Sequence, residues 1–266
     1  MSVRINIMLT DIELEKIEYR YLRTISDALR SNINGVVSGL KSMNRIKDYW
    51  NSVHKRGDGF DTGFERIIYS ALQSNATDLG KPNSCLVGAD LFFESDDAFI
   101  HIDAKSYQPG NNTRDHWSNK IEANQSSYET SYRVDEESRS FKPNLPKYYN
   151  VNGSDKPTLT YFVNILYDVD FDNDDIFQSL EILNINVSCM PNGQLHNVYQ
   201  NIMIGAGGNI DVKKVRFKMF YESQVLKFSL IEQKPNRVKK IYENIDLINQ
   251  TEMSSKTQLL NFLSLI

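Results

Sequence analysis

The sequence predicts an α/β protein with a central mixed β-sheet flanked by helices. Stretches with apolar residues at helical spacing occur at 11–34 and 62–72. Short runs rich in Val, Ile and Phe, typical of buried strands, occur at 86–93, 98–107, 159–169 and 182–190. A chain of 266 residues buries a large core, so we expect one domain spanning residues 1–266.

The composition is that of an ordinary globular protein, with 40% hydrophobic and 24% charged residues and a net charge of −4. No apolar run approaches the roughly 20 residues that span a bilayer, and residues 1–10 lack a signal-peptide pattern. Two cysteines are too few for a disulfide framework or a zinc site. We therefore expect a cytoplasmic protein without a membrane partner.

The N-terminal region 11–56 is expected to be helical. Apolar residues form one stripe from Asp11 to Asn34, with Thr10 as the N-cap. A second stripe, from Val36 to Trp50, predicts another helix. The two helices would form an antiparallel hairpin that packs on the sheet or on a partner subunit.

A further amphipathic helix is predicted from Thr62 to Leu72, with Asp61 or Thr62 as its N-cap. Glu65 lies beside the apolar stripe of this helix and would therefore approach the edge of the core. The helix macrodipole alone would also favour a glutamate near the N-terminus, by about 0.3–1 kcal/mol. The sequence leaves both roles open.

The stretch from Cys85 to Tyr107 is expected to form a β-hairpin with a polar turn at 94–97. Side chains alternate between the faces of a strand. In the second strand, Asp103 and Lys105 therefore share a face with Phe99 and His101, while the apolar residues between them form the face toward the core.

Pairing of the two strands would bring Asp90 beside Asp103. Adjacent carboxylates raise each other's pKa unless a cation lies between them, and hard divalent cations such as Mg²⁺ prefer carboxylate oxygen. Lys105 would balance the remaining charge and hold a water or a phosphate oxygen. The alternative for Lys105 is an exposed lysine at the end of a strand.

The pattern Asp90…Asp103-Ala104-Lys105 resembles the PD-(D/E)xK nuclease superfamily, with Ala89 where the family has proline. Glu65 is similar to a glutamate that many type II restriction endonucleases of this superfamily carry on a helix upstream of the first acid. The resemblance implies a restriction-endonuclease-like fold with its catalytic core at about 60–107 and 157–190. It implies catalysis by Asp90, Asp103, Lys105 and Glu65, with the three acids as metal ligands. It also implies Mg²⁺, a double-stranded DNA substrate, 5′-phosphate products and a homodimer.

Segment 107–149 is the first candidate DNA-recognition region, because polar residues, aromatics and prolines dominate it. We expect little regular structure there apart from a short helix at 117–128, and a long irregular stretch is uncommon unless it is functional or disordered. An ordinary surface excursion is the alternative. The side chains suited to base edges and phosphates are Asn111, Asn112, Arg114, Lys120 and Gln125.

Segment 205–240 is the second candidate region, and it contains two expected strands at 213–222 and 224–233. From Lys213 to Lys240, nine Lys and Arg residues stand against two Glu residues, so the local charge is 9 − 2 = +7. Concentrated positive charge indicates docking of a polyanion, although chance clustering on a solvated face would give the same count. The expected phosphate contacts are Lys213, Lys214, Arg216, Arg237, Lys239 and Lys240.

These features together predict a Mg²⁺-dependent, sequence-specific endodeoxyribonuclease of a restriction–modification system. Two alternatives stay open: a DNA repair or recombination nuclease of the same superfamily, and a non-catalytic DNA-binding module that keeps the nuclease-like sheet. Discrete fragments from intact plasmid would indicate a restriction enzyme, and a preference for branched DNA a repair nuclease. Shifted but uncut DNA would indicate a binding module.

Overall fold

The computed structural model describes residues 9–42, 58–84, 88–107, 120–134, 137–168, 180–199, 203–205, 214–217, 220–222, 225–227, 237–244 and 246. Its α-helices are α1 (Asp11–Ser31), α2 (Ile33–Leu40) and α4 (Asp58–Asn75), and its 3₁₀ turns are η2 (Thr77–Leu79), η3 (Ala123–Gln125) and η4 (Gly193–Asn197). Within these ranges no helix combines the length and the apolar character needed to cross a lipid bilayer.

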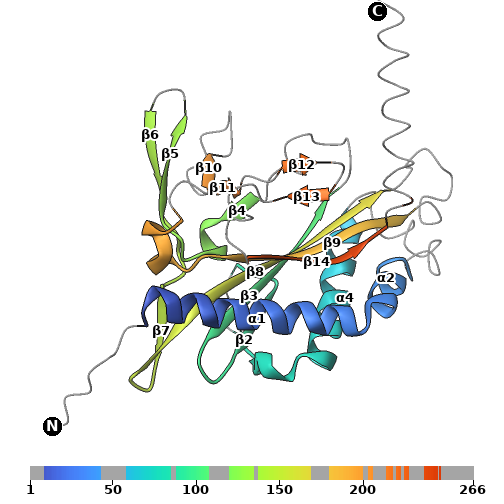
Figure 1. Ribbon diagram of the computed structural model, residues 1–266, viewed down its shortest axis with the longest axis horizontal. Coiled ribbons are helices and arrows are strands. Elements are labelled where there is room, and N and C mark those ends of the chain that lie inside the picture. Colours follow the sequence, from blue (N-terminus) through green and yellow to red (C-terminus); the bar gives the residue numbers. More distant parts are fainter. Residues whose placement is uncertain are drawn as a thin grey trace, which may run out of the picture.

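A seven-stranded mixed sheet forms the centre of the molecule, as predicted (Figure 1). Its strand order is β1-β2-β3-β8-β9-β14, with β7 paired to β8. Strands β3 and β8 are parallel, and the other pairs are antiparallel. The strands are β1 (Lys81–Pro82), β2 (Leu91–Glu94), β3 (Phe99–Tyr107), β7 (Tyr148–Val151), β8 (Ser154–Asp168), β9 (Glu181–Met190) and β14 (Val238–Glu243).

Helices α1 and α4 pack against each other and against one face of this sheet. Their apolar stripes are buried, as Leu22 and Ile25 in α1 and Phe64 and Ile68 in α4 show. The Tyr161 hydroxyl on β8 donates to the backbone carbonyl of Glu18 in α1 at 2.8 Å. Burial of these stripes against the strands explains why the two amphipathic patterns predict helices correctly.

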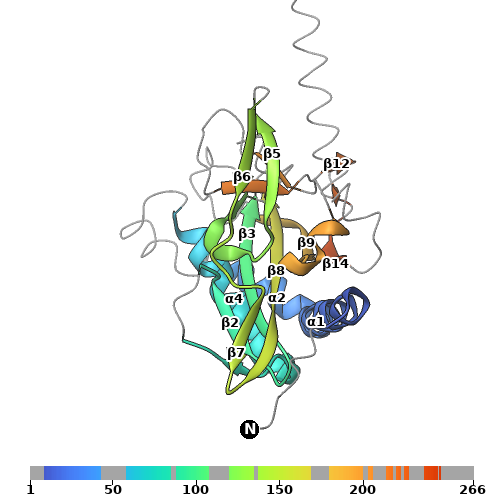
Figure 2. The same ribbon diagram turned by 90° about the vertical axis from the view of Figure 1, so that its left-hand side faces the viewer.

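Smaller β elements lie on the side of the sheet away from α1 (Figure 1). One is a three-stranded sheet in the order β10-β11-β4, and two are hairpins, β5–β6 and β12–β13. In Figure 2 the β5–β6 hairpin extends beyond the end of the central sheet. These strands are β4 (Lys120–Glu122), β5 (Thr130–Val134), β6 (Glu137–Phe141), β10 (Met203–Gly205), β11 (Lys214–Phe217), β12 (Phe220–Glu222) and β13 (Val225–Lys227).

The structure confirms the first helix and its cap. The Thr10 hydroxyl accepts from the Glu13 amide at 3.3 Å, and the Glu13 carboxylate accepts from the Thr10 amide at 2.8 Å. The predicted cap of the 62–72 helix is wrong, because α4 begins at Asp58 and so contains Asp61 and Thr62. The part of the predicted second helix at 43–50 lies outside the described residues, as does the rest of the helical region to residue 56.

The prediction for segment 107–149 is also wrong where the segment is described. A strand and a 3₁₀ turn, β4 and η3, occupy much of the expected helix at 117–128, and three more strands follow. Strand β4 pairs with β11, which lies far later in the chain. A three-residue strand whose partner is so remote has no periodicity of its own, so tertiary pairing decides its conformation.

Candidate active site

The β2–β3 hairpin places Asp90 and Asp103 side by side. The strands pair from Leu91 opposite Ile102 to Glu94 opposite Phe99, and one further step of this register puts Asp90 opposite Asp103. The first strand is shorter than predicted, but the expected juxtaposition is confirmed. A carboxylate oxygen of Asp90, Oδ2, accepts from the backbone amide of Ala104 at 2.7 Å, which fixes Asp90 at the point where β2 begins.

Both faces of β3 are buried before Asp103, so the expectation of a single core-facing side is wrong. His101 is fully buried and stacks on Phe92 with 4.3 Å between ring centroids. Its Nε2 lies 3.3 Å from the Tyr149 hydroxyl of β7. Burial lowers the pKa of His101 to about 4, so the imidazole is neutral at pH 7 and packs as part of an aromatic layer beneath the acids.

Asp103 is almost fully buried, with only 1% of its surface exposed. The pKa of Asp103 is raised to about 7, mainly by burial; Lys105 opposes the rise, and the nearby charges of Asp90 and Glu65 contribute to it. The Lys105 ammonium forms an ion pair with Asp103 Oδ1 and keeps 23% of its side chain exposed. The predicted face shared by Asp103 and Lys105 is therefore confirmed, and Lys105 lies between the buried acid and solvent.

Glu65 projects from α4 toward this cluster and is partly buried. Its charge contributes to the raised pKa of Asp103, which places it near the two aspartates as expected. Among the described side chains, however, no set of three or more His, Cys, Asp or Glu residues is arranged to hold a metal ion. Whether Glu65 is a ligand or a helix-stabilising acid stays a prediction.

The aspartate pair fits a magnesium ion chemically. Burial, together with the charges of Asp90 and Glu65, disfavours ionisation of Asp103, and a cation between the two aspartates would relieve their repulsion. Mg²⁺ usually binds through one or two carboxylates and keeps several waters. Asp90 and Asp103 would therefore hold the ion, without a closed protein cage around it.

Gln125 belongs to this site, although the sequence predicts it as a DNA contact. Its side chain is 6% exposed, and its Nε2 donates to Asp103 Oδ2 at 2.6 Å. The side-chain amide is thus bound to the Asp103 carboxylate. No local pattern could have revealed the contact, because β4 and η3 are brought to the hairpin only by tertiary folding.

Arg237 is wrongly predicted as a DNA contact, because it is 3% exposed. Its Nη1 pairs with Glu18 Oε2 of α1 at 2.5 Å, and its Nε donates to the Tyr199 hydroxyl at 2.8 Å. The guanidinium is neutralised inside the protein, so a count of charges along the sequence overstates the positive charge available to DNA.

Lys239 and Lys240 are also engaged within the protein. Strand register places Lys239 opposite Val187, on the helix-covered face of the sheet, away from Asp103. Its ammonium lies 5.0 Å from the centroid of the Tyr19 ring in α1. Lys240 forms an ion pair with Glu243 at 2.7 Å, and half of its side chain remains exposed.

The other predicted DNA contacts divide into two groups. Lys120 on β4 and Arg216 on β11 are cross-strand neighbours, and Lys214 pairs with Glu122 in the same small sheet. The structure thus brings backbone positions from both candidate recognition segments together. Four further predicted contacts lie outside the described residues, namely Asn111, Asn112, Arg114 and Lys213.

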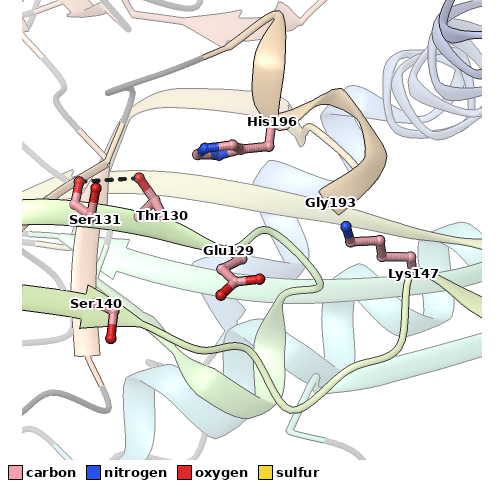
Figure 3. Close-up of a pocket in the computed structure, with 7 residues that line it drawn as sticks. All are labelled: Glu129, Thr130, Ser131, Ser140, Lys147, Gly193 and His196. Carbon is pink, nitrogen blue, oxygen red and sulfur yellow. Dashed lines mark hydrogen bonds between the residues drawn. The ribbon is translucent and has the colours of Figure 1, made fainter.

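A separate pocket of about 240 Å³ lies at the base of the β5–β6 hairpin. Figure 3 shows Glu129, Lys147 and His196 around it, each contributed by a different segment. Hydroxyl groups of Thr130, Ser131 and Ser140 complete much of its polar wall. The pocket does not include the aspartate pair, and its acid and its lysine leave it without a marked charge.

Comparison with known proteins agrees with this architecture. The sequence pattern of a family described as "Type II restriction enzyme MwoI, N-terminal domain" matches residues 10–173, and that of the "central domain" of the same enzyme matches residues 182–243. No curated protein sequence matches the chain at a significant level.

Two solved structures share the fold. The restriction endonuclease BglI bound to its DNA recognition sequence aligns with a TM-score of 0.68 and 16% identity over 86% of this chain and 90% of that chain. Tetrameric restriction endonuclease SfiI bound to cognate DNA aligns with a TM-score of 0.63 and 17% identity over 90% of this chain and 87% of that chain. The restriction-endonuclease-like α/β fold is therefore confirmed.

Proposed function

Because this chain belongs to the family of type II restriction enzymes represented by MwoI, we propose that its aspartate pair cleaves double-stranded DNA with Mg²⁺. Family membership makes the chain a type II site-specific deoxyribonuclease. The finer proposal is that it leaves 5′-phosphate ends, serves a restriction–modification system and acts as a homodimer that cuts both strands. BglI and SfiI, two solved structures with this fold, are both bound to DNA.

The observation that carries the proposal is the arrangement of Asp90, Asp103 and Lys105 at one strand end. Asp90 is held by the Ala104 amide, and Asp103 is held by Gln125 and Lys105. A divalent cation bound to the two carboxylates would polarise the scissile phosphate. The two carboxylates are negatively charged and would repel the phosphate, so they would act on it only through the cation that they hold.

Lys105 would act directly on the reacting phosphate. Negative charge builds on the non-bridging oxygens during phosphodiester hydrolysis, and a fixed cation beside them stabilises the transition state more than the ground state. The Lys105 ammonium is partly exposed while anchored on Asp103. The ammonium would therefore contact a substrate oxygen without first leaving a buried environment.

Incubation with intact DNA tests the proposal. A mixture of plasmid and genomic DNA with Mg²⁺ should yield discrete fragments, and the same mixture with EDTA should yield none. Fragments that ligate without prior phosphorylation would demonstrate 5′-phosphate ends. The Asp103→Asn variant, purified in parallel, controls for contaminating nuclease. Intact DNA after incubation across many sequences with Mg²⁺ or Mn²⁺ would refute the proposal.

A further inference from the structure

The 3₁₀ turn η3 contacts the segment before β2, which carries Asp90, and strand β3, which carries Asp103. The Gln125 Nε2 group donates to Asp103 Oδ2 at 2.6 Å and lies 3.4 Å from the carbonyl oxygen of Gly88. The backbone amide of Gly88 donates to the carbonyl of Asn124 at 3.1 Å. Gly88 is two residues before Asp90, so the same turn supports the approach to the first acid and the carboxylate of the second.

The orientation of the Gln125 amide is fixed by its third contact. Its Oε1 accepts from the backbone amide of Glu122 at 2.9 Å, so the Nε2 hydrogens must point toward Asp103 and Gly88. The group is nearly buried. A buried amide whose donors and acceptor are all used holds its partners in one geometry.

The turn also follows directly on the small sheet. Glu122, which binds Gln125 Oε1, ends strand β4, and β4 pairs with β11 along Lys120–Arg216, Ile121–Val215 and Glu122–Lys214. Ile121 is fully buried in the core cluster. A shift of β4 would therefore move the Gln125 side chain through the hydrogen bond from the Glu122 backbone amide to Gln125 Oε1.

We propose that Gln125 is a positioning residue, which orients the Asp103 carboxylate for the divalent cation and ties the aspartate pair to the β4–β11 strands that carry predicted DNA contacts. The inference deepens the proposed function and rests on it for the identity of the cation site. Partners that orient a metal ligand typically change metal affinity or activity by about 10–100-fold when they are lost.

The test compares Gln125→Met with the matched control Gln73→Met. Methionine keeps the length of the side chain but cannot donate to Asp103, and Gln73 lies exposed on α4. Three quantities are measured: Mn²⁺ binding to DNA-free protein by calorimetry, the single-turnover cleavage rate as a function of Mg²⁺ concentration, and the melting temperature. We expect Gln125→Met to weaken Mn²⁺ binding and to raise the Mg²⁺ midpoint by about 10–100-fold, with DNA affinity in EDTA unchanged.

Normal Mn²⁺ affinity and a normal Mg²⁺ midpoint in folded Gln125→Met would overturn the inference. Gln125→Asn is the second variant, because its side chain stays polar but is too short to reach Asp103. If Gln125→Met does not fold, the same measurements on Gln125→Asn test whether the contact with Asp103 affects metal binding. Wild-type protein that binds Mn²⁺ but cuts no DNA would refute the proposed function alone, since calorimetry still tests Gln125. Wild-type protein that neither binds Mn²⁺ nor cuts DNA with Mg²⁺ would overturn both.

Discussion

Ionisation of Asp103 is electrostatically unfavourable, because this carboxyl is nearly buried and lies near two other acids. We expect Asp90→Asn and Asp103→Asn to reduce cleavage at least about a hundredfold, because the amide oxygen supplies no charge to a divalent cation. DNA binding in EDTA should remain, because neither acid contacts phosphate directly. The measurements are single-turnover rates and fluorescence anisotropy with labelled duplex. Cleavage by Asp103→Asn near the wild-type rate would remove this acid from the mechanism.

The same substitution has a predictable effect on stability. The pKa of Asp103 is raised to about 7 in the folded protein, above its unfolded value. The folded state therefore binds a proton more strongly, and its stability falls as the pH rises from the unfolded pKa through about 7. Metal-free Asp103→Asn should accordingly be at least as stable as the wild type at pH 8.

Substitutions of Lys105 test whether cleavage needs a compact ammonium group beside the acids. Lys105→Ala should lower the single-turnover rate by about 10²–10³-fold, the usual loss for one preorganised electrostatic group, with little change in DNA affinity. Lys105→Arg should not restore the rate, because a planar guanidinium places its charge differently from an ammonium and does not release a proton. Two variants that both cut at the wild-type rate would show that Lys105 is a solvated strand-end lysine.

At the scale of elements, α1 is joined to the turn of the β2–β3 hairpin. The Tyr21 hydroxyl donates to Asp97 Oδ1 at 2.6 Å, and Arg20 forms an ion pair with the other oxygen of the same carboxylate. Partial burial opposes ionisation of Asp97, but the hydrogen bonds from Arg20 and Tyr21 outweigh it and lower the pKa of Asp97. The turn between β2 and β3 is thereby fixed on a rigid helix.

This contact should be sensitive to acid. A carboxyl with a lowered folded pKa adds stability above its unfolded pKa, near 4, and that stability is lost as the pH falls through the folded value. We expect Asp97→Asn to destabilise the protein at pH 7 by on the order of 1 kcal/mol or less, because the ion pair is half-exposed. Urea unfolding at pH 7 and pH 3 measures the difference, which should shrink at pH 3. A penalty that is equal at both values would contradict ionisation of Asp97 as its source.

At the scale of the whole molecule, the Glu18–Arg237 pair joins α1 to the start of β14. Glu18 is 1% exposed, and its second oxygen accepts from the Asn192 amide at 2.7 Å. Arg237→Met should cost about 3–5 kcal/mol of unfolding free energy, because it leaves a buried carboxylate without its counter-charge. The double variant Arg237→Met with Glu18→Leu should recover most of this loss. Urea unfolding of the two single variants and the double variant tests the pair, and additive losses would show that the two residues are not coupled.

Charge available to DNA is a second property of the whole molecule. Lys239 and Lys240 have partners inside the protein. Lys120 and Arg216 are backbone neighbours in the small sheet, on the strand that leads into η3 and on its partner. We expect Lys120→Ala and Arg216→Ala each to reduce the salt slope of duplex binding by about 0.9. The matched control Lys239→Ala should leave the slope unchanged. Anisotropy titrations at several salt concentrations measure it, and a reduction confined to Lys239→Ala would reverse this assignment.

The sequence by itself determined the features that depend on local periodicity. Alternation along β3 places Asp103 and Lys105 on one face, and the apolar stripe of α4 brings Glu65 toward the same cluster. The Thr10–Glu13 capping box and the strands β8 and β9 are equally local. Each of these features depends on residues only a few positions apart, so it can be predicted from the sequence without knowing which distant residues it contacts.

Only the tertiary structure decided which side chains are committed to partners elsewhere in the chain. Arg237 is buried and forms an ion pair with Glu18. Gln125 donates to Asp103 from the turn that follows β4, the strand paired with β11. Both residues look like surface contacts in a polar or basic stretch. Burial converts them into internal partners, because a buried charge or amide must be satisfied within the protein, and no local pattern specifies which distant group satisfies it.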